Sequence, residues 1–246
     1  MGKILHMLPV LLLVGAGLVL PCPAGAGQKI PEKLEYSLSW TGINVGTATQ
    51  EIVDEGETRR IISSARSNAW LSRFFPVDDR TESVLLKKGV FPGEPRTFTM
   101  LFREGSHTRD REISFNVAAR VAHFHDRKNG EKVTVPIDGE TFDIYSSFYF
   151  VRHQHLEPGR SFYINVLDSK KLHRIEVRVL KRERVSVPAG EFTTLKVEPM
   201  VKPVGVFEGK RGAYIWLTDD ERRIPVKAQT KVTVGSVTAV LTGGVY

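Results

Sequence analysis

The sequence is poor in cysteine and lacks the familiar catalytic motifs. Cys22 is its only cysteine, and it lies in an N-terminal segment that we expect to be removed. The mature chain would then have no disulfide and no thiol chemistry. A lipoprotein would be cut before Cys22, but Pro21 stands where a small residue is usual, so lipidation is disfavoured.

There is no Gly-x-Ser-x-Gly elbow, His-Glu-x-x-His helix, phosphate loop or glycine-rich dinucleotide turn, and no cofactor is indicated.

Long apolar runs are also rare, and the one near the N-terminus has the organisation of a signal peptide. Lys3 precedes an apolar run over residues 8–20, and Ala24-Gly25-Ala26 follows. The run is shorter than the roughly 20 residues of a membrane-spanning helix, and the triplet is a pattern that signal peptidase accepts. We therefore expect residues 1–26 to be a cleaved signal peptide, and residues 27–246 to form a periplasmic protein.

Basic side chains outnumber acidic ones. The chain has 35 Lys and Arg residues against 28 Asp and Glu residues, a formal net charge of +7. Such a surface attracts anionic lipid headgroups or acidic glycans, although a solvated surface without a ligand fits equally well. Nucleic acid is an unexpected partner for an exported protein. Nothing in the composition indicates an oligomeric state.

Apolar and polar residues alternate along most of the mature chain. Leu34, Tyr36, Leu38 and Trp40 alternate with polar residues, as in a strand with one face on a core and the other in water. The same period of two recurs over residues 113–117, 133–138, 175–179 and 195–198. Short strands separated by turn signals predict one all-β domain, built as a strongly curved antiparallel sheet or an open β-barrel.

Two local signals refine this prediction. Asn129-Gly130 favours a two-residue type I′ hairpin turn, in which both central residues have positive φ. Residues 68–75 are expected to form one or two helical turns that are capped by Asn68 and ended by Pro76.

The main helix is expected over residues 143–156, packed on or in the sheet. Asp143 can accept hydrogen bonds from the first free amides, and Pro158-Gly159 follows the end. Three apolar residues share one face of this helix: Ile144, Phe148 and Val151. We interpret the helix as a plug or lid.

One strand is apolar on both sides. Ala213, Ile215 and Leu217 point one way, whereas Tyr214 and Trp216 point the other. Such a strand lies beneath a helix or inside a curled sheet. A sheet that is curled and covered in this way can enclose a cavity.

The sharpest metal candidates are His123 and His125. Alternate residues of a strand share a face, so two imidazoles could hold one ion there. Zinc sites need three or four ligands, and the sequence offers no third one. Polar residues before a turn are the favoured interpretation.

Charged residues gather at Asp78, Arg80 and Glu82, which share one side of a strand. They form either an ion-paired sheet face, which is the favoured interpretation, or the polar floor of a pocket. Acid-base hydrolysis at this strand is the enzymatic alternative.

Aromatic and basic side chains of the main helix and of two strands pack in the core or line a ligand pocket. The candidate ligand-binding residues are therefore Trp40, Asp78, Arg80, Tyr149, Arg152 and Trp216.

Five motifs, in this order and spacing, resemble the bacterial domain-of-unknown-function family numbered 3108. They are residues 36–46, the strand over residues 78–83, the helix with Asp143, Ser147, Tyr149 and Arg152, and residues 187–192 and 215–220. The resemblance spans nearly the whole mature chain. It implies an exported envelope protein and leaves its activity open.

These observations lead to one principal functional hypothesis and two alternatives. We expect a non-enzymatic periplasmic protein that binds an apolar or amphipathic envelope molecule, such as a lipid, or assists envelope assembly. The first alternative is a metal-dependent or acid-base hydrolase. The second is an interaction module whose basic surface docks on a membrane or on anionic glycan.

Overall fold

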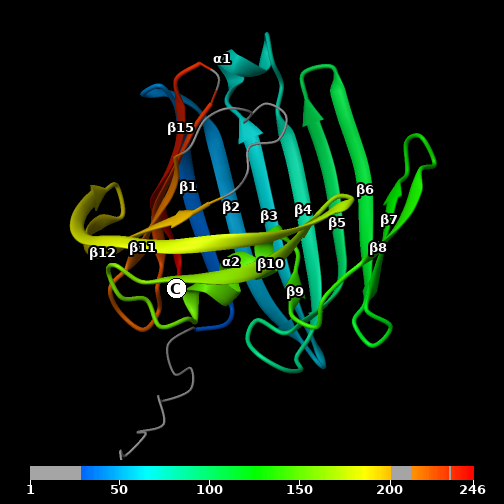
Figure 1. Ribbon diagram of the computed structural model, residues 1–246. Helices are drawn as coiled ribbons and strands as arrows, with labels where there is room; N and C mark the ends of the chain where they lie inside the picture. The colour runs from blue at the N-terminus through cyan, green and yellow to red at the C-terminus, as the bar shows by residue number, and fades with distance from the viewer. Residues whose placement is uncertain (1–28, 201–211, 233) are drawn as a thin grey trace, which may run out of the picture.

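The computed structural model describes residues 29–200, 212–232 and 234–246, so the expected signal peptide and Cys22 lie outside the described residues. Strands dominate, and two helices interrupt them (Figure 1). The elements are β1 Glu32–Trp40, β2 Ile43–Glu55, β3 Thr58–Ser67, α1 Ala69–Ser72, β4 Asp78–Leu86, β5 Glu94–Glu104, β6 His107–Asn116, β7 Val121–Asp126, β8 Lys132–Pro136, β9 Thr141–Phe142, α2 Ile144–Arg152, β10 Ser161–Asp168, β11 Lys171–Val187, β12 Gly190–Pro199, β13 Ala213–Thr218, β14 Pro225–Lys231 and β15 Ser236–Val245.

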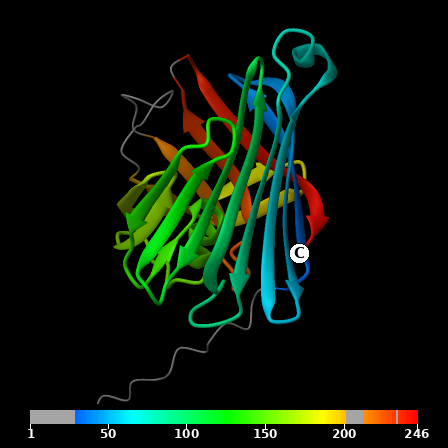
Figure 2. The same cartoon turned by 90° about the vertical axis from the view of Figure 1, so that its right-hand side faces the viewer.

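The strands form one sheet, in the order β8-β7-β6-β5-β4-β3-β2-β1-β15-β14-β13-β12-β11-β10-β9. All neighbours are antiparallel except β9 and β10, which pair in parallel. The chain meanders outward from β1 to β8, crosses through α2, and returns from β10 to β15 on the other side of β1. The returning half curls across the first half (Figures 1 and 2). The expected curved antiparallel sheet with one main helix is confirmed.

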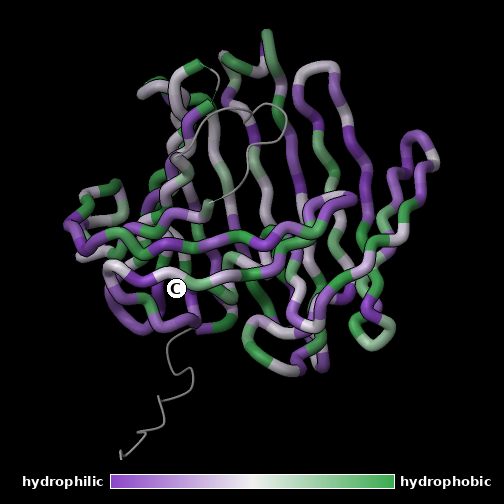
Figure 3. The backbone as a smooth tube through the Cα atoms, viewed as in Figure 1, coloured by the Kyte–Doolittle hydropathy of each residue, from purple (hydrophilic) through white to green (hydrophobic). Residues whose placement is uncertain are grey.

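The alternating sequence explains the inner face of the sheet. Leu34, Ile52, Ile61, Leu85 and Ile113 each have at most 1% of their surface exposed. Their strand neighbours in sequence are more exposed and lie on the outer face. Figure 3 shows this alternation as changes of colour along single strands. The buried row is the core of the first half of the sheet.

Both helices lie where the sequence predicts them, although α2 is shorter than expected. Asn68 caps α1 by accepting a hydrogen bond from the amide of Leu71 at 3.2 Å. Helix α2 ends at Arg152 rather than at residue 156, because His153 and Gln154 donate to carbonyls only three residues back. That tighter bonding closes the helix before Pro158 is reached. In the described part of the chain, neither helix is long and apolar enough to span a bilayer.

The expected two-residue turn at Asn129-Gly130 is wrong. β7 and β8 are joined by residues 127–131, and only Gly130 among them has positive φ, at 76°. The amide of Gly130 donates to the carbonyl of Asp126 at 2.9 Å, which closes a wider turn. A positive φ at one glycine therefore suffices here, whereas a type I′ turn needs two.

Candidate functional site

The curl of the sheet encloses a cavity of about 610 Å³ between its two halves. Residues of β1, β2 and β3 line one side, α2 lines another, and β10 to β15 supply the rest. The curled-over strands contribute a largely apolar wall, which consists of Ile164, Val166, Ile175, Val177, Val197 and Ile215. A volume of this size lies within the range of pockets that enclose small organic ligands, about 300–1,000 Å³.

The ionisable lining residues of the curled-over strands lie at or near strand ends, whereas Thr49, Gln50 and Ser63 line the cavity from the middles of β2 and β3. Asp168 and Lys231 are the last residues of β10 and β14, Glu198 is next to the end of β12, and His173 is near the start of β11. Two acidic and two potentially basic groups therefore accompany an apolar interior. This distribution suits a molecule with an apolar body and a polar part.

Helix α2 turns its predicted apolar face to the cavity. Ile144, Phe148 and Val151 all line it. The other side of α2 carries Tyr149 and Arg152, which are buried in the surrounding protein. The cavity therefore exists because α2 is held by its polar side, leaving its apolar side facing open space.

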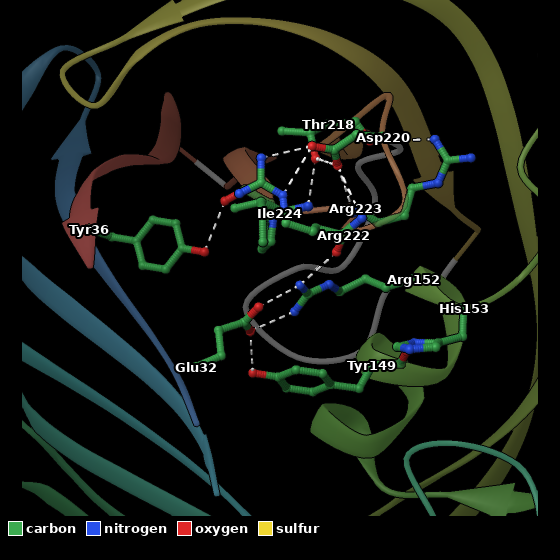
Figure 4. A network of polar contacts seen from close by, with 11 residues as sticks. Glu32, Tyr36, Tyr149, Arg152, His153, Thr218, Asp220, Arg222, Arg223 and Ile224 are labelled. Carbon is green, nitrogen blue, oxygen red and sulfur yellow. Dashed lines mark hydrogen bonds and ion pairs between the residues drawn. The ribbon is translucent and has the colours of Figure 1, made fainter. Parts of the chain in front are cut away.

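A buried ion pair holds α2 against the first strand (Figure 4). Arg152 donates from Nη1 and Nη2 to the two carboxylate oxygens of Glu32, each at 2.8 Å. The hydroxyl of Tyr149 donates to Glu32 Oε1 at 3.1 Å. Glu32 and Arg152 are at most 2% exposed, so the bidentate pair and the Tyr149 bond offset the cost of removing both charges from water.

The same arginine contacts the connection between β13 and β14. Arg152 Nη2 donates to the carbonyl of Arg222 at 3.0 Å. Asp220 shapes that connection by accepting from the hydroxyl of Thr218 at 2.6 Å and from the amides of Arg222 and Arg223 at 3.1 and 3.2 Å. Because β13 and β14 also line the cavity, this network fixes α2 relative to the opposite wall (Figure 4).

Burial controls the protonation of this network. Burial raises the pKa of both Tyr36 and Tyr149 well above the usual value, so each remains a neutral hydrogen-bond donor. Tyr36 uses its hydroxyl to donate to the carbonyl of Pro225 at 2.9 Å. Burial by itself lowers the pKa of Arg152, but the hydrogen bonds to Glu32 outweigh it and the pKa is raised. Arg152 therefore stays charged.

Asp143 anchors the start of α2. Its Oδ1 accepts from the amides of Tyr145 and Ser146, each at 2.9 Å. Its Oδ2 accepts from the hydroxyl of Ser83 on β4 at 2.6 Å and from that of Ser146 at 2.7 Å. The carboxyl group is fully buried, and burial raises its pKa despite these four bonds. The cap therefore also ties the helix to the sheet.

The structure brings together two of the six candidate ligand-binding residues, Tyr149 and Arg152, and none of the six lines the cavity. Trp40 is exposed, and its indole donates to the carbonyl of Val234 at 2.8 Å. Trp216 is buried on the other side of β13 from Ile215, and its indole donates to Glu183 at 2.7 Å. These tryptophans lie outside the network of α2.

Asp78 and Arg80 lie on the outer face of β4, because Thr81 and Ser83 are buried on its inner face. Arg66 Nε and Asp78 are 3.0 Å apart, and Arg80 Nη2 and Glu82 are 3.6 Å apart, so the ion-paired sheet face is present. Asp78 and Arg80 also line a polar hollow of about 420 Å³.

Sequence reasoning missed Glu32, the acidic partner of the network. A signal was present, because Glu32 occupies the inward phase of a strand that continues with Leu34 and Tyr36. A charged residue in that phase is buried only if it is paired. Its partner lies 120 positions away, and the sequence does not identify it.

The metal candidates His123 and His125 lie on the outer face of β7. Ala122 and Phe124, which alternate with them along the strand, are buried on the inner face. The Nδ1 atom of His123 is 3.1 Å from the hydroxyl of Thr134. Within residues 29–200, 212–232 and 234–246, no three His, Cys, Asp or Glu side chains are grouped to hold a metal ion.

Three solved structures are similar to the chain, and the first of them supports the fold. A beta-barrel-like protein of the domain of unknown function DUF1849 from Brucella abortus is similar with a TM-score of 0.56 and 11% identity, covering 90% of this chain and 100% of that one. A DUF1089 family protein from Pseudomonas aeruginosa has a TM-score of 0.38 and 14% identity, covering 84% and 94%. A candidate exported protein with a YmcC-like fold from Bacteroides fragilis has a TM-score of 0.33 and 11% identity, covering 92% and 100%.

At these identities the likeness to the Brucella abortus protein concerns the fold alone. No curated protein matches the chain. The model of one protein family matches residues 35–242, which include nearly all strands and both helices. The chain therefore belongs to the family described as proteins of unknown function, DUF3108.

Proposed function

We propose that the protein binds an amphipathic molecule with a hydrocarbon chain, such as a lipid, in the cavity beside α2. The observation that carries the proposal is the apolar wall around about 610 Å³ of open space, completed by Ile144, Phe148 and Val151 of the helix. An unfilled apolar space of this size forfeits packing contacts, which a hydrocarbon chain would supply.

The N-terminal sequence supports a place of action outside the cytoplasm. Residues 1–26 have the charge, apolar run and small residues of a signal peptide. A periplasmic protein meets amphipathic molecules of the cell envelope, so compartment and cavity chemistry point to the same class of ligand.

A series of straight-chain alkanoates of increasing length tests the proposal. Each buried methylene contributes about 0.8 kcal/mol, so affinity measured by calorimetry should rise about fourfold per added carbon. The increase should stop once the chain fills the cavity. Affinity that does not depend on chain length would contradict the proposal.

A matched pair of variants on β2 locates the binding. Ala48 lines the cavity, whereas its neighbour Thr47 lies on the exposed outer face. Ala48→Phe should weaken binding of the longest well-bound alkanoate at least tenfold, because the ring occupies the same space, while Thr47→Phe should leave it unchanged.

Thermal unfolding checks that both variants fold. If Ala48→Phe does not fold, Ala228→Phe on β14 provides a second way to fill the cavity. Equal binding by a folded cavity-filling variant and by Thr47→Phe would show that the chain binds elsewhere.

A further inference from the structure

Exposed apolar side chains gather at one end of the sheet, where three connections meet. These are the β1–β2 turn, the segment of α1 and the residues after it, and the β14–β15 turn, which lie together at the upper end in Figures 1 and 2. We call this group the apolar tip, and its members are Trp40, Ile43, Trp70, Phe74, Phe75 and Val234. They are six of the twelve large apolar residues that are exposed in the described part of the chain.

Hydrogen bonds hold the three connections together. The indole of Trp40 donates to the carbonyl of Val234 at 2.8 Å, which joins the first connection to the third. The indole of Trp70 donates to the carbonyl of Asn44 at 3.1 Å, and the side-chain amide of Asn68 donates to the same oxygen at 2.9 Å. The tip is therefore a formed surface rather than a set of independent loops.

The chemistry of the tip suits the boundary between water and lipid. Both indole N–H groups already have acceptors within the protein, so the rings can leave water without losing a hydrogen bond. Phe74 is 81% exposed, so most of its ring surface is in contact with water. Tryptophan and phenylalanine at such positions are typical of surfaces that insert shallowly into membranes.

The charge around the tip is also complementary to an anionic membrane. Residues 66–80 and 103–109 contain five arginines and three carboxylates. Arg73 is exposed within the tip itself, between Trp70 and Phe74. Carboxylates offset part of this charge, because Arg66 pairs with Asp78, Arg80 with Glu82 and Arg109 with Glu104. Arg73 forms no ion pair with the described residues, and an exposed cation at the tip favours anionic headgroups.

We propose that the apolar tip attaches the protein to the surface of a bilayer that contains anionic lipid. The apolar side chains enter the region between headgroups and acyl chains, and the arginines remain at the headgroups. This site is separate from the cavity, because none of its six residues lines that space.

Sedimentation with vesicles tests the proposal, using phosphatidylcholine alone and mixed with phosphatidylglycerol. The protein should bind the mixed vesicles more tightly, and sodium chloride should weaken that binding. Phe74→Ser and Trp70→Ser should each reduce partition about tenfold, because a large apolar side chain no longer leaves water. Tyr163→Ser is the matched control, since Tyr163 is an exposed aromatic residue on β10, outside the tip.

Several outcomes would overturn the proposal. They are no binding of the wild type to either vesicle, equal binding to both, or unchanged binding by folded Phe74→Ser and Trp70→Ser variants. Thermal unfolding confirms folding, and alkanoate binding by Phe74→Ser should equal that of the wild type. Failure of the cavity proposal and failure of the membrane proposal are thus distinguishable.

Discussion

At the scale of single residues, the ion pair of Glu32 and Arg152 fixes the position of α2 beside the cavity, although neither residue lines the cavity. Two charges in a dry interior are costly, and a bidentate geometry with added hydrogen bonds is the arrangement that offsets this cost. The pair connects β1, α2 and the β13–β14 connection. Its function is therefore to position the helix.

Breaking this pair should be strongly destabilising. Arg152→Met should lower the free energy of unfolding by about 3–5 kcal/mol, because a buried carboxylate loses its guanidinium. Urea denaturation measures the effect. The double variant Glu32→Leu with Arg152→Met should lose much less than the sum of the two single changes. Additive losses would show that the pair does not couple the two segments.

At the scale of elements, the sequence largely predicts where α2 lies in the chain and which of its faces is apolar. It does not predict what that apolar face contacts. Asp143 as the cap, and Ile144, Phe148 and Val151 as one face, are properties of the local sequence. The sequence indicates an apolar face but not whether packed side chains or open space will meet it. That outcome depends on Glu32 and Ser83, which are distant in the chain.

The cap of α2 can be tested by two substitutions. Asp143→Ala should lower the free energy of unfolding by about 1–2 kcal/mol, because two helix amides and the hydroxyl of Ser83 lose their acceptor. Asp143→Asn keeps an acceptor for the amides and should cost less. Equal losses in the two variants would contradict this role of the side-chain oxygen.

The pH dependence of the asparagine variant follows from the raised pKa of Asp143. The folded protein holds the proton on this carboxyl more tightly than the unfolded chain does. The stability that the group contributes is therefore fully present below the usual pKa of about 3.9 and declines as the pH rises through and above it. Asparagine does not titrate, so the free energy of unfolding of Asp143→Asn relative to the wild type should increase above about pH 4.

At the scale of the whole molecule, alternation along the chain predicts one curved antiparallel sheet, but it does not predict the strand order. From β1 to β8 and from β10 to β15, each strand pairs with the strand that follows it in the chain, as consecutive strands commonly do. The pairing of β1 with β15 is not local, and the curl that creates the cavity depends on it. Period-two patterns specify faces of strands and leave such distant partners open.

Strand order makes a prediction about proline. Val240 on β15 pairs with Ser37 on one side and Lys227 on the other, so Val240→Pro should cost about 3 kcal/mol or more by disrupting the ladder. The control is Thr134→Pro on the edge strand β8. The amide of Asp126 donates to the carbonyl of Glu131, and the amide of Ile137 donates to that of Arg120. In an antiparallel pair only every second residue bonds to the partner strand, and Thr134, which lies opposite His123, is one of the others. Its amide therefore points away from β7. Denaturant unfolding should show a much smaller loss there.

The meeting of β1 and β15 also bears on how the chain acquires its structure. The hydroxyl of Thr242 donates to the carbonyl of Glu35 across 207 positions of sequence. Closing so long a loop costs conformational entropy before any contact between the two strands can offset it. The pairing of β1 with β15 should therefore form late, and folding should be slow. Until then β1 and β15 present unpaired edges to other chains, and newly made protein is exposed to aggregation during that interval.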